Sequence, residues 1–498
     1  MKQTNEYKPA ALKEREAYRA VIQALGRRRG GATAADISAA SAVPLAAVRE
    51  LLPRAADEYQ GRLQVTESGE IIYSFPQGFT SRYRGFWAGL KRFSGKLGSG
   101  LAWLGSLLFK VWIMVMLVGY FALFMALALL SVFAAVAGNS RNSSSRRGGG
   151  AHFSFGLLDL FIRLWFYSEL TKPARQYGGY GNRKPQSGPS RPLHRAIFAF
   201  VFGDADPNQD WTAREKKAVI AYIQARRGVI ALPELMALTG KNSAEAEKAV
   251  MACCSEFGGV PEATEAGTIV YRFDELLART GTNNSGTLQP PVRRLKPFSE
   301  NPKSMNTWFG IINTVNLLFG SYFVYHAFNT GAILSTEQLQ STSFLYGFVY
   351  AFLGNIAGNP LSFISIGLGL VPLAFSLLFW LIPALRFFRE KKENENTKLG
   401  NLKRLGFSMI WSDPLKVDSG SITSQADECR PHNMAAAQER VIKDMGAYSV
   451  PEVAITAAGG TVYSFTELER EKMALEQYRE GIDIEKAGIG KTVFDSGA

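Results

Sequence analysis

The ten residues TESGEIIYSF, from Thr66 to Phe75, recur as TEAGTIVYRF from Thr264 to Phe273. The two segments lie 198 positions apart (264 minus 66), and the same offset aligns residues 21–75 with residues 219–273 without a gap. Because chance similarity does not hold one register over such a length, this pattern indicates an internal repeat. The repeat decides the fold that we expect for the part of the chain outside its apolar segments.

The aligned copies agree where arginine and glycine occur. The motif Arg-Arg-Gly stands at 28–30 and at 226–228, and Gly61 aligns with Gly259. A third copy ends in residues 459–465, which resemble residues 267–273. In both copies a Val-Pro-Glu triplet precedes this segment, at 260–262 and at 450–452. The earlier half of the third copy, from Gly420, is more diverged. The sequence therefore predicts three copies of one module.

Each copy is predicted to fold as three helices followed by a hairpin. The elements expected in the first copy are a helix over 12–25, a short helix to Ser41 capped by Thr33, a third helix with Pro44 in its first turn, and a hairpin with its turn at Ser68-Gly69. Helix-turn-helix followed by a two-stranded wing resembles the winged-helix fold. The expected class of each module is therefore α+β.

Two blocks of the chain are apolar enough to enter a membrane. Leu101 to Gly138 contains one charge, Lys110, and about 20 apolar residues suffice to cross a bilayer. Trp308 to Phe328 is a second candidate, and Phe344 to Phe388 is free of charge until Arg386, with a break at Gly358-Asn359-Pro360. The predicted architecture is three winged-helix-like repeats interleaved with mainly α-helical transmembrane blocks.

The resulting domain layout has eight segments. They are module 1 (1–80), membrane block 1 with its basic flank (81–172), a basic and Gly-rich linker with an Asp-rich turn (173–210), module 2 (211–280), a linker (281–303), membrane block 2 (304–390), module 3 (400–480) and a tail (481–498).

Topology follows from the distribution of basic residues. Lys and Arg flank membrane block 2, whereas residues 330–342 carry none, so this loop is expected outside. Residues 153–167, with Asp159 and Arg163, form either an interfacial anchor or a return crossing. If all modules share one compartment, block 1 must return. We therefore expect a multi-pass protein of the bacterial inner membrane with cytoplasmic modules, targeted by its internal spans since the N-terminus lacks a signal-peptide pattern.

The net charge of +13 allows two kinds of anionic partner. Much of the basic excess flanks the membrane blocks, where anionic lipid explains it. DNA binding is disfavoured for module 2, whose third helix, 243–257, carries Glu245, Glu247 and Glu256. Module 1 keeps a set of candidate nucleic-acid or lipid contacts: Arg27, Arg28, Arg29, Arg49 and Arg54.

A weak calcium-loop candidate precedes module 2. Its oxygen-bearing side chains are those of Asp204, Asp206, Asn208, Asp210 and Glu215. However, Gln209 stands where the loop needs glycine. The competing interpretation is an Asx-rich turn before the first helix of module 2, with Asp210 or Thr212 as the N-cap and Glu215 completing a capping box.

Nothing in the sequence indicates catalysis or a resident cofactor. No nucleophile elbow, P-loop, zinc-protease or dinucleotide motif occurs. The four histidines are scattered, and the three cysteines, Cys253, Cys254 and Cys429, form no CxxC pair. Adjacent cysteines on a helix point about 100 degrees apart, so core packing is favoured over a redox role.

Three stretches carry a resemblance to a known family: residues 73–76, residues 202–208 and residues 259–276. They resemble a poorly characterised family of multi-pass membrane proteins from cyanobacteria and chloroplasts, whose plant members are sometimes labelled iron-sulfur cluster biosynthesis proteins. The resemblance spans residues 21–276 and implies architecture. The label of the plant members implies an iron-sulfur cluster, but the cysteines of this sequence lack any familiar spacing of cluster ligands.

These observations lead to one expectation with two alternatives. The leading hypothesis is a non-enzymatic membrane scaffold whose modules bind each other or protein partners, with the bilayer as the other partner and no small-molecule substrate. The alternatives are a membrane-tethered DNA-binding regulator that acts through module 1, and a transporter or assembly factor that uses the broken helix at Gly358 to Pro360.

Overall fold

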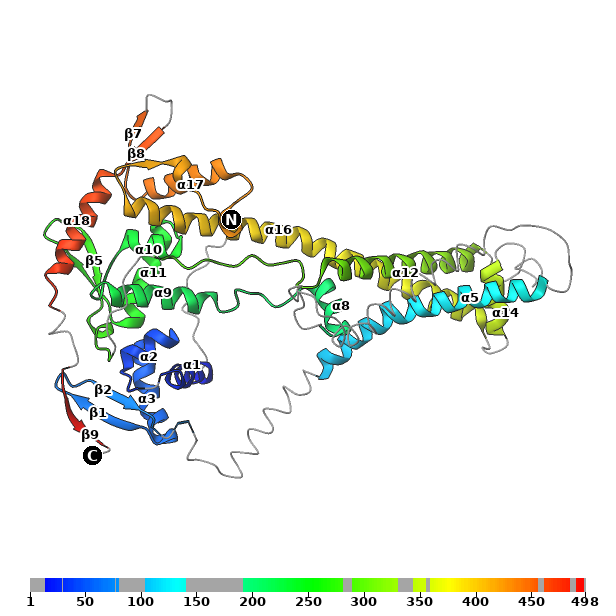
Figure 1. The fold of residues 1–498 in the computed structure, drawn as a ribbon, viewed down its shortest axis with the longest axis horizontal. Coiled ribbons are helices and arrows are strands. Elements are labelled where there is room, and N and C mark those ends of the chain that lie inside the picture. Colours follow the sequence, from blue (N-terminus) through cyan, green and yellow to red (C-terminus); the bar gives the residue numbers. More distant parts are fainter. Residues whose placement is uncertain are drawn as a thin grey trace, which may run out of the picture. The chain divides into compact units, whose positions relative to one another are not determined.

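The computed structural model describes residues 14–28, 30–76, 78–79, 104–139, 191–280, 289–329, 344–354, 359–455, 461–483 and 490–496. The chain divides into two compact units, each assembled from segments that are distant in sequence (Figure 1). Unit 1 comprises residues 1–93, 205–296 and 391–498, and unit 2 comprises residues 94–204 and 297–390. Helix α16 (Val371–Ser412) begins in unit 2 and ends in unit 1.

Module 1 contains the predicted helices and hairpin: α1 (Glu14–Gly26), α2 (Ala34–Ser41), α3 (Leu45–Tyr59), β1 (Arg62–Thr66) and β2 (Ile71–Ser74). Thr33 caps α2, because its hydroxyl accepts from the Asp36 N–H at 3.2 Å while the Asp36 carboxylate accepts from the Thr33 N–H at 3.1 Å. Pro44 lies one residue before α3 rather than in its first turn. The described residues thus contain the three helices and the hairpin expected here, but not the expected position of Pro44.

Module 2 comprises α9 (Trp211–Ala225), β3 (Val229–Ala231), α10 (Leu232–Thr239), α11 (Ser243–Phe257), β4 (Val260–Ala263), β5 (Ile269–Arg272) and the 3-10 helix η2 (Asp274–Leu276). The bounds of α11 are those predicted. The predicted capping box at α9 is wrong. Asp210 precedes the helix without a side-chain cap, and the Glu215 carboxylate instead pairs with Arg404 and Lys241.

Module 3 begins inside α16 and continues with β6 (Val417–Asp418), two 3-10 turns η5 (Ser419–Ser421) and η6 (Asp427–Cys429), α17 (Met434–Gly446), β7 (Glu452–Ile455), β8 (Thr461–Ser464) and α18 (Thr466–Glu480). The C-terminal part of α16 supplies buried core residues such as Leu402, Phe407 and Trp411. The boundary expected at residue 400 therefore falls within one continuous helix.

Each module contains a three-stranded sheet. The strand orders are β2-β1-β9, β3-β5-β4 and β6-β8-β7. Strand β9 (Thr492–Asp495) comes from the segment expected to be a tail, and it pairs antiparallel with β1 of module 1. The sheet of module 1 is thus completed by residues that lie more than 400 positions away in the chain.

Two hydrophobic clusters join the modules of unit 1. The first combines residues of module 1, such as Val48 and Leu52, with residues of module 2, such as Phe257. The second combines Val270 and Met236 of module 2 with the core of module 3. Module 2 therefore contributes to both clusters, and apolar burial is continuous through all three modules.

The aligned glycines at 61 and 259 each lie beneath an aromatic ring. A Cβ at Gly259 would come within 2.4 Å of the Phe273 ring, and a Cβ at Gly61 within 2.7 Å of the Phe75 ring. The repeat therefore keeps glycine at this position because the phenylalanine that ends the hairpin fills the space of a side chain.

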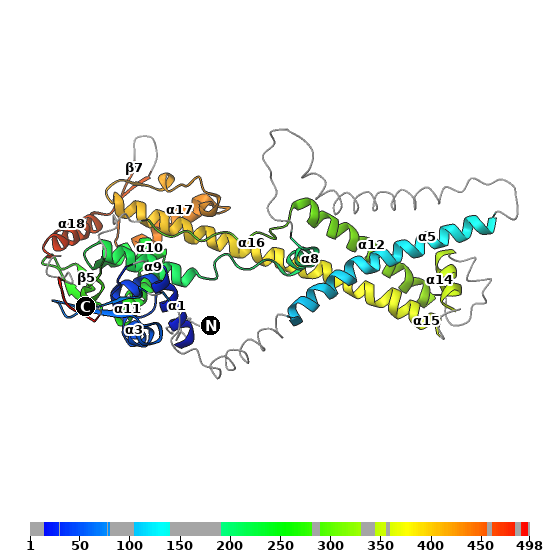
Figure 2. The same cartoon turned by 60° about the horizontal axis from the view of Figure 1, so that its bottom comes forward.

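Unit 2 contains the apolar helices α5 (Tyr120–Asn139, preceded by a π-helical turn η1, Val115–Gly119), α8 (Leu193–Phe202), α12 (Lys303–Asn329), α14 (Phe344–Gly354), α15 (Pro360–Ser362) and the π-helical η4 (Phe363–Leu370). Helices α5, α12 and α14 lie side by side (Figure 2). Helix α8 falls in the range expected to be a linker; its Ile197 and Phe200 are buried in the same hydrophobic cluster as Leu117 and Phe379.

Two of the described helices are long and apolar enough to cross a membrane. They are Leu104–Val136, with a mean hydropathy of 2.6, and Pro360–Ser412, with 2.2 in its most apolar window. Helix α12, which contains the expected span from Trp308 to Phe328, is not one of them. Its buried Asn313 and Asn316 are among the polar residues that lower its hydropathy.

Side-chain donors bind backbone carbonyls at the π-helical turns of unit 2. The Asn316 amide donates to the Leu117 carbonyl of η1 at 2.8 Å, and the Tyr120 hydroxyl donates to the Gly367 carbonyl of η4 at 2.9 Å. In an apolar environment, neighbouring helices must satisfy such carbonyls. The two contacts thus join η1 to α12 and the start of α5 to η4.

Several sequence-based expectations fall outside the described residues. These are the amphipathic run at 153–167 with Asp159 and Arg163, the loop at 330–342, and Gly358 of the helix break. Within the described part of that break, Asn359 caps α15 by accepting from the Ser362 N–H at 3.2 Å, and Pro360 occupies the first helical turn.

We expect Gly259→Ala to destabilise unit 1 by about 1–3 kcal/mol, because the added methyl group overlaps the fully buried Phe273 ring. The measurement is the thermal unfolding midpoint of the full chain in detergent, which should fall by several degrees. Gly30→Ala is the control, since no heavy atom lies within 4 Å of its added Cβ. Equal shifts in the two variants would contradict the ring-packing explanation.

Candidate interaction surface

A cleft of about 810 Å³ lies where the three modules of unit 1 meet. Module 1 contributes Glu70 from the turn before β2, module 2 contributes the ends of its hairpin and η2, and module 3 contributes one face of α18, including Gln477. The cleft exists only because the modules are packed together. It is the candidate site that the structure offers for a ligand or partner.

The walls of the cleft are mainly acidic. Among the described residues that line it, the carboxylates are those of Glu70, Glu265, Asp274, Glu275 and Asp483, whereas Arg272 is the one arginine and there is no lysine. The side-chain hydrogen bond to Asp274 raises the pKa of Arg272, which therefore stays charged and paired. Complementary charge steers association, so this surface favours a basic partner over an anionic one.

Ion pairs position the walls. The guanidinium of Arg49, on α3, lies 3.1 Å from the Glu275 carboxylate of module 2 and 3.7 Å from the Glu70 carboxylate of module 1. On the opposite wall, the Tyr478 hydroxyl of α18 donates to the Glu262 carboxylate. Residues of all three modules thus hold the cleft in one shape.

A buried ion pair fixes α18 against module 2. Arg479 Nη2 lies 2.6 Å from Glu234 Oε2 and also donates to the Val229 carbonyl at 2.9 Å. The two side chains are only 4% and 0% exposed. The other carboxylate oxygen of Glu234 accepts from the Tyr222 hydroxyl at 2.5 Å. Every oxygen of this buried carboxylate therefore has a partner.

Arg479 and Tyr222 in this buried cluster each keep one protonation state. Burial alone would lower the pKa of Arg479, but the Glu234 carboxylate outweighs it and the pKa is raised. Burial, followed by the charge of Glu234, raises the pKa of Tyr222. Arg479 is therefore cationic and Tyr222 neutral across the physiological pH range. The ion pair consequently joins modules 2 and 3 throughout that range, and we call such a buried contact between modules a lock.

A second lock joins modules 1 and 2 at the equivalent position of the repeat. Asp36 aligns with Glu234 (234 minus 198), and both are the third residue of a helix. The Asp36 carboxylate is 3% exposed, pairs with Arg28 at 2.9 Å, and accepts from the Thr280 hydroxyl of module 2 at 2.9 Å. The Thr33 hydroxyl donates to the Ala278 carbonyl at 2.6 Å.

The candidate nucleic-acid residues of module 1 are largely engaged within unit 1. Arg28 pairs with Asp36, Arg49 bridges two carboxylates, and Arg54 pairs with Glu14 at 2.9 Å and lies over the Tyr18 ring. Arg27 is exposed at the end of α1, and Arg29 lies outside the described residues. Helix α3 contacts α11 of module 2. The structure thus uses these arginines mainly for intramolecular pairing.

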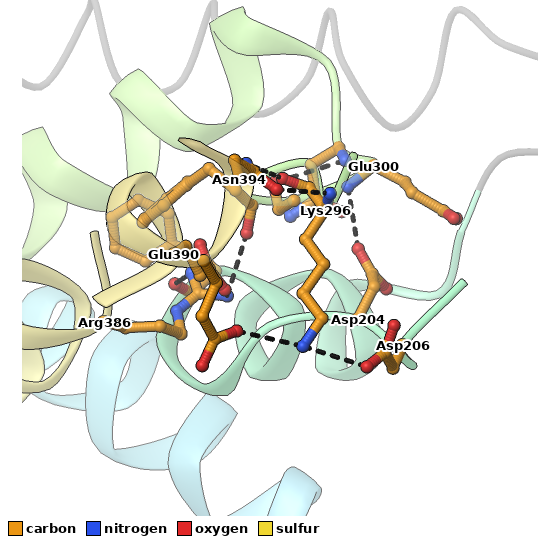
Figure 3. A network of polar contacts seen from close by, with 12 residues as sticks. Asp204, Asp206, Lys296, Glu300, Arg386, Glu390 and Asn394 are labelled. Carbon is orange, nitrogen blue, oxygen red and sulfur yellow. Dashed lines mark hydrogen bonds and ion pairs between the residues drawn. The ribbon is translucent and has the colours of Figure 1, made fainter. Parts of the chain in front are cut away.

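The oxygen side chains of the calcium-loop candidate bind protein groups. In unit 1, Asp206 accepts from the Asn208 N–H at 2.9 Å and lies 2.9 Å from Lys296 Nζ (Figure 3). Burial alone would raise the pKa of Asp206, but these hydrogen bonds outweigh it and the pKa is lowered. The Asn208 amide binds both backbone groups of Arg294, at 2.7 and 3.0 Å.

The remaining members of that candidate are also placed. In unit 2, Asp204 pairs with Arg191 at 2.5 Å and accepts from the Glu300 N–H at 2.7 Å. Glu215 pairs with Arg404 at 3.1 Å, and Asp210 is exposed at the start of α9. Across the residues that the structure describes, no three His, Cys, Asp or Glu side chains lie together as metal ligands.

The cysteines are not poised for reaction. Cys253 and Cys254 lie on α11, and Cys429 is buried in module 3; all three thiols are free. Burial raises the pKa of Cys253 to about 12 and also raises the pKa of Cys254 and Cys429. The thiolate is the reactive form of cysteine, so each of these thiols is held in its less reactive state.

Comparison with known proteins identifies a distant relative. The chain is 22% identical over 408 residues to an uncharacterised chloroplastic protein of Arabidopsis thaliana, and the match covers 79% of this chain and 72% of the relative. This is consistent with the resemblance to a family that has chloroplast members. The relative's name assigns it neither a membrane location nor an iron-sulfur role. No family model and no solved structure matches the chain.

We expect Arg479→Met to destabilise unit 1 by about 3–5 kcal/mol, because it leaves the buried Glu234 carboxylate without its counter-charge. The double variant Glu234→Leu with Arg479→Met should recover much of this loss, since it buries no charge. The measurement is chemical unfolding of the full chain in detergent.

Arg470→Met on the same helix is the matched control. Arg470 and its partner Glu467 are 75% and 64% exposed, and exposed ion pairs contribute less than about 1 kcal/mol. A loss for Arg479→Met no larger than that of the control would show that the buried pair is not a lock.

Proposed function

We propose that this protein is a membrane-anchored scaffold whose three winged-helix-like modules form one platform for protein partners. The observation that carries the proposal is the pair of buried locks, Arg479 with Glu234 and Asp36 with Thr280, that join successive modules. Both partners of each lock belong to this chain, so the modules present their cleft as one body. The role requires no catalysis and no resident cofactor.

The order of elements supports the winged-helix assignment. Each module has helices followed by an antiparallel hairpin, and in modules 2 and 3 a short strand, β3 or β6, pairs with the second hairpin strand. In module 1 the corresponding contact is the single bridge between Ala32 and Tyr73. This common plan favours three copies of one fold, as the sequence repeat predicts.

The membrane part of the proposal rests on two apolar helices. Of the most apolar windows of Leu104–Val136 and Pro360–Ser412, only 28% and 33% are buried within the protein. The core helix of a soluble protein would be mostly buried, so lipid is the natural cover for the exposed remainder. We extend this to a multi-pass arrangement that includes α12 and α14, in which Asn313 and Asn316 face other helices rather than lipid.

Protein partners are favoured over DNA because the third helix of module 1 is packed against module 2. Its third helix, α3, is the element that would enter the major groove. That helix lies against α11, and its Arg49 is bound to Glu275 of module 2. The adjacent cleft is acidic, which disfavours a phosphate backbone. A basic protein surface suits it better.

We further propose the bacterial inner membrane as the location, with the modules on the cytoplasmic side. The basic residues that flank membrane block 2 support this orientation. Reporter fusions placed after Tyr180 and after Lys398 test it, because both positions should report the cytoplasmic side. Reporters on opposite sides would contradict the topology, and release of the full chain from membranes by alkaline carbonate would contradict membrane insertion.

The platform is tested by photo-crosslinking in cells. A benzophenone amino acid at Gln477, which is exposed on the cleft wall, should capture one or a few defined proteins. The same amino acid at Glu439, exposed on α17 outside the cleft lining, is the control and should give several-fold less adduct. Equal adduct yields at the two positions would rule out the cleft as the partner-binding surface.

A further inference from the structure

The three wing hairpins, β1–β2, β4–β5 and β7–β8, pair in the same register. The residues that lie opposite the aligned tyrosines Tyr73, Tyr271 and Tyr463 are Leu63, Pro261 and Val453. The outer edges of β1, β4 and β7 can therefore be compared residue by residue. They differ in what covers them.

The outer edge of β1 is covered by a strand of the same chain. The Leu63 carbonyl accepts from the Ser496 N–H at 2.9 Å, and the Leu63 N–H donates to the Ser496 hydroxyl at 2.9 Å. In an antiparallel strand, the N–H and C=O of one residue face the same side. The backbone N–H and C=O of Leu63 therefore face away from β2, and β9 pairs with this outer edge of β1.

The outer edge of β4 is blunted by a proline. Pro261 occupies the position equivalent to Leu63, so the N–H that would face outward is missing. Proline on an edge strand is a common means of preventing further strand addition. Strand β4 nevertheless pairs normally with β5, which shows that proline is compatible with the hairpin at this position.

The outer edge of β7 is neither covered by another described strand nor interrupted by a proline. Val453 has the outward N–H that Pro261 lacks, and Ile455 follows it on the same edge. Strand β7 contains no proline, lysine or arginine, and none of the described strands pairs with its outer edge. Val453 and Ile455 are 61% and 81% exposed, and the nearby Val450 is 80% exposed. Such an edge is a template for another strand.

We propose that the outer edge of β7 binds an extended segment of a partner protein as an added antiparallel strand. The precedent is β9, which occupies the equivalent edge of β1 with the sequence Thr492-Val493-Phe494-Asp495. Backbone hydrogen bonds to Val453 and Ile455 supply the pairing, and the exposed apolar side chains select a segment rich in β-branched or aromatic residues without proline. The inference rests on the proposed scaffold function and names the class of partner.

The test uses a labelled peptide with the sequence of residues 490–496, GKTVFDS, and the full chain in detergent. We expect saturable binding, measured by fluorescence anisotropy. Val453→Pro removes the outward N–H and should weaken binding about tenfold. The natural Pro261 indicates that the hairpin tolerates this change. Val453→Thr keeps the N–H, favours a strand, and should bind within about threefold of the unaltered chain.

A second, chemically modified peptide tests the proposal on the unaltered protein, so the result does not depend on how the Val453→Pro variant folds. Ser496 faces β1 through its N–H, so Phe494, two residues earlier, faces the same side. A peptide methylated on the Phe494 nitrogen should therefore lose binding to the unaltered protein.

Three outcomes would overturn the proposal. They are no binding of the unmodified peptide, binding that persists in Val453→Pro, and a dimer that Val453→Pro dissolves, which would assign the edge to a second copy. None of them alters crosslinking at Gln477, so failure of this inference is distinguishable from failure of the scaffold function.

Discussion

The buried ion pair between Arg479 and Glu234 is the contact on which unit 1 depends. Both side chains are almost fully excluded from solvent, and an unpaired charge at either position would be strongly unfavourable. Helix α18 is therefore stable against module 2 only in the orientation that forms the pair. That orientation places Gln477 and Tyr478 on the cleft wall.

One repeated position supplies both locks. Asp36 and Glu234 are equivalent acidic residues near the start of equivalent helices, and each accepts a backbone N–H of its own capping residue. The carboxylate that stabilises the helix start also binds a donor from another module. The two equivalent acids bind different donors, the Thr280 hydroxyl in one case and the Arg479 guanidinium in the other.

Intramolecular packing covers two surfaces of module 1. The third helix of module 1 lies against module 2, and the outer edge of β1 is covered by β9. Among the described residues, the acidic cleft and the outer edge of β7 are not covered in this way. The basic side chains of module 1 are largely engaged within the chain, because Arg28, Arg49 and Arg54 each pair with a carboxylate.

The sequence by itself determined the local elements. Thr33 as a helix cap, the bounds of α11 and the turn at Ser68-Gly69 depend on residues a few positions apart, so periodicity and spacing are sufficient. Only the tertiary structure decided that Glu234 binds Arg479, 245 positions away, and that residues 492–495 form a strand on β1. Such pairings depend on which surfaces meet after folding, and no local pattern encodes the partner of a buried charge or of a strand edge.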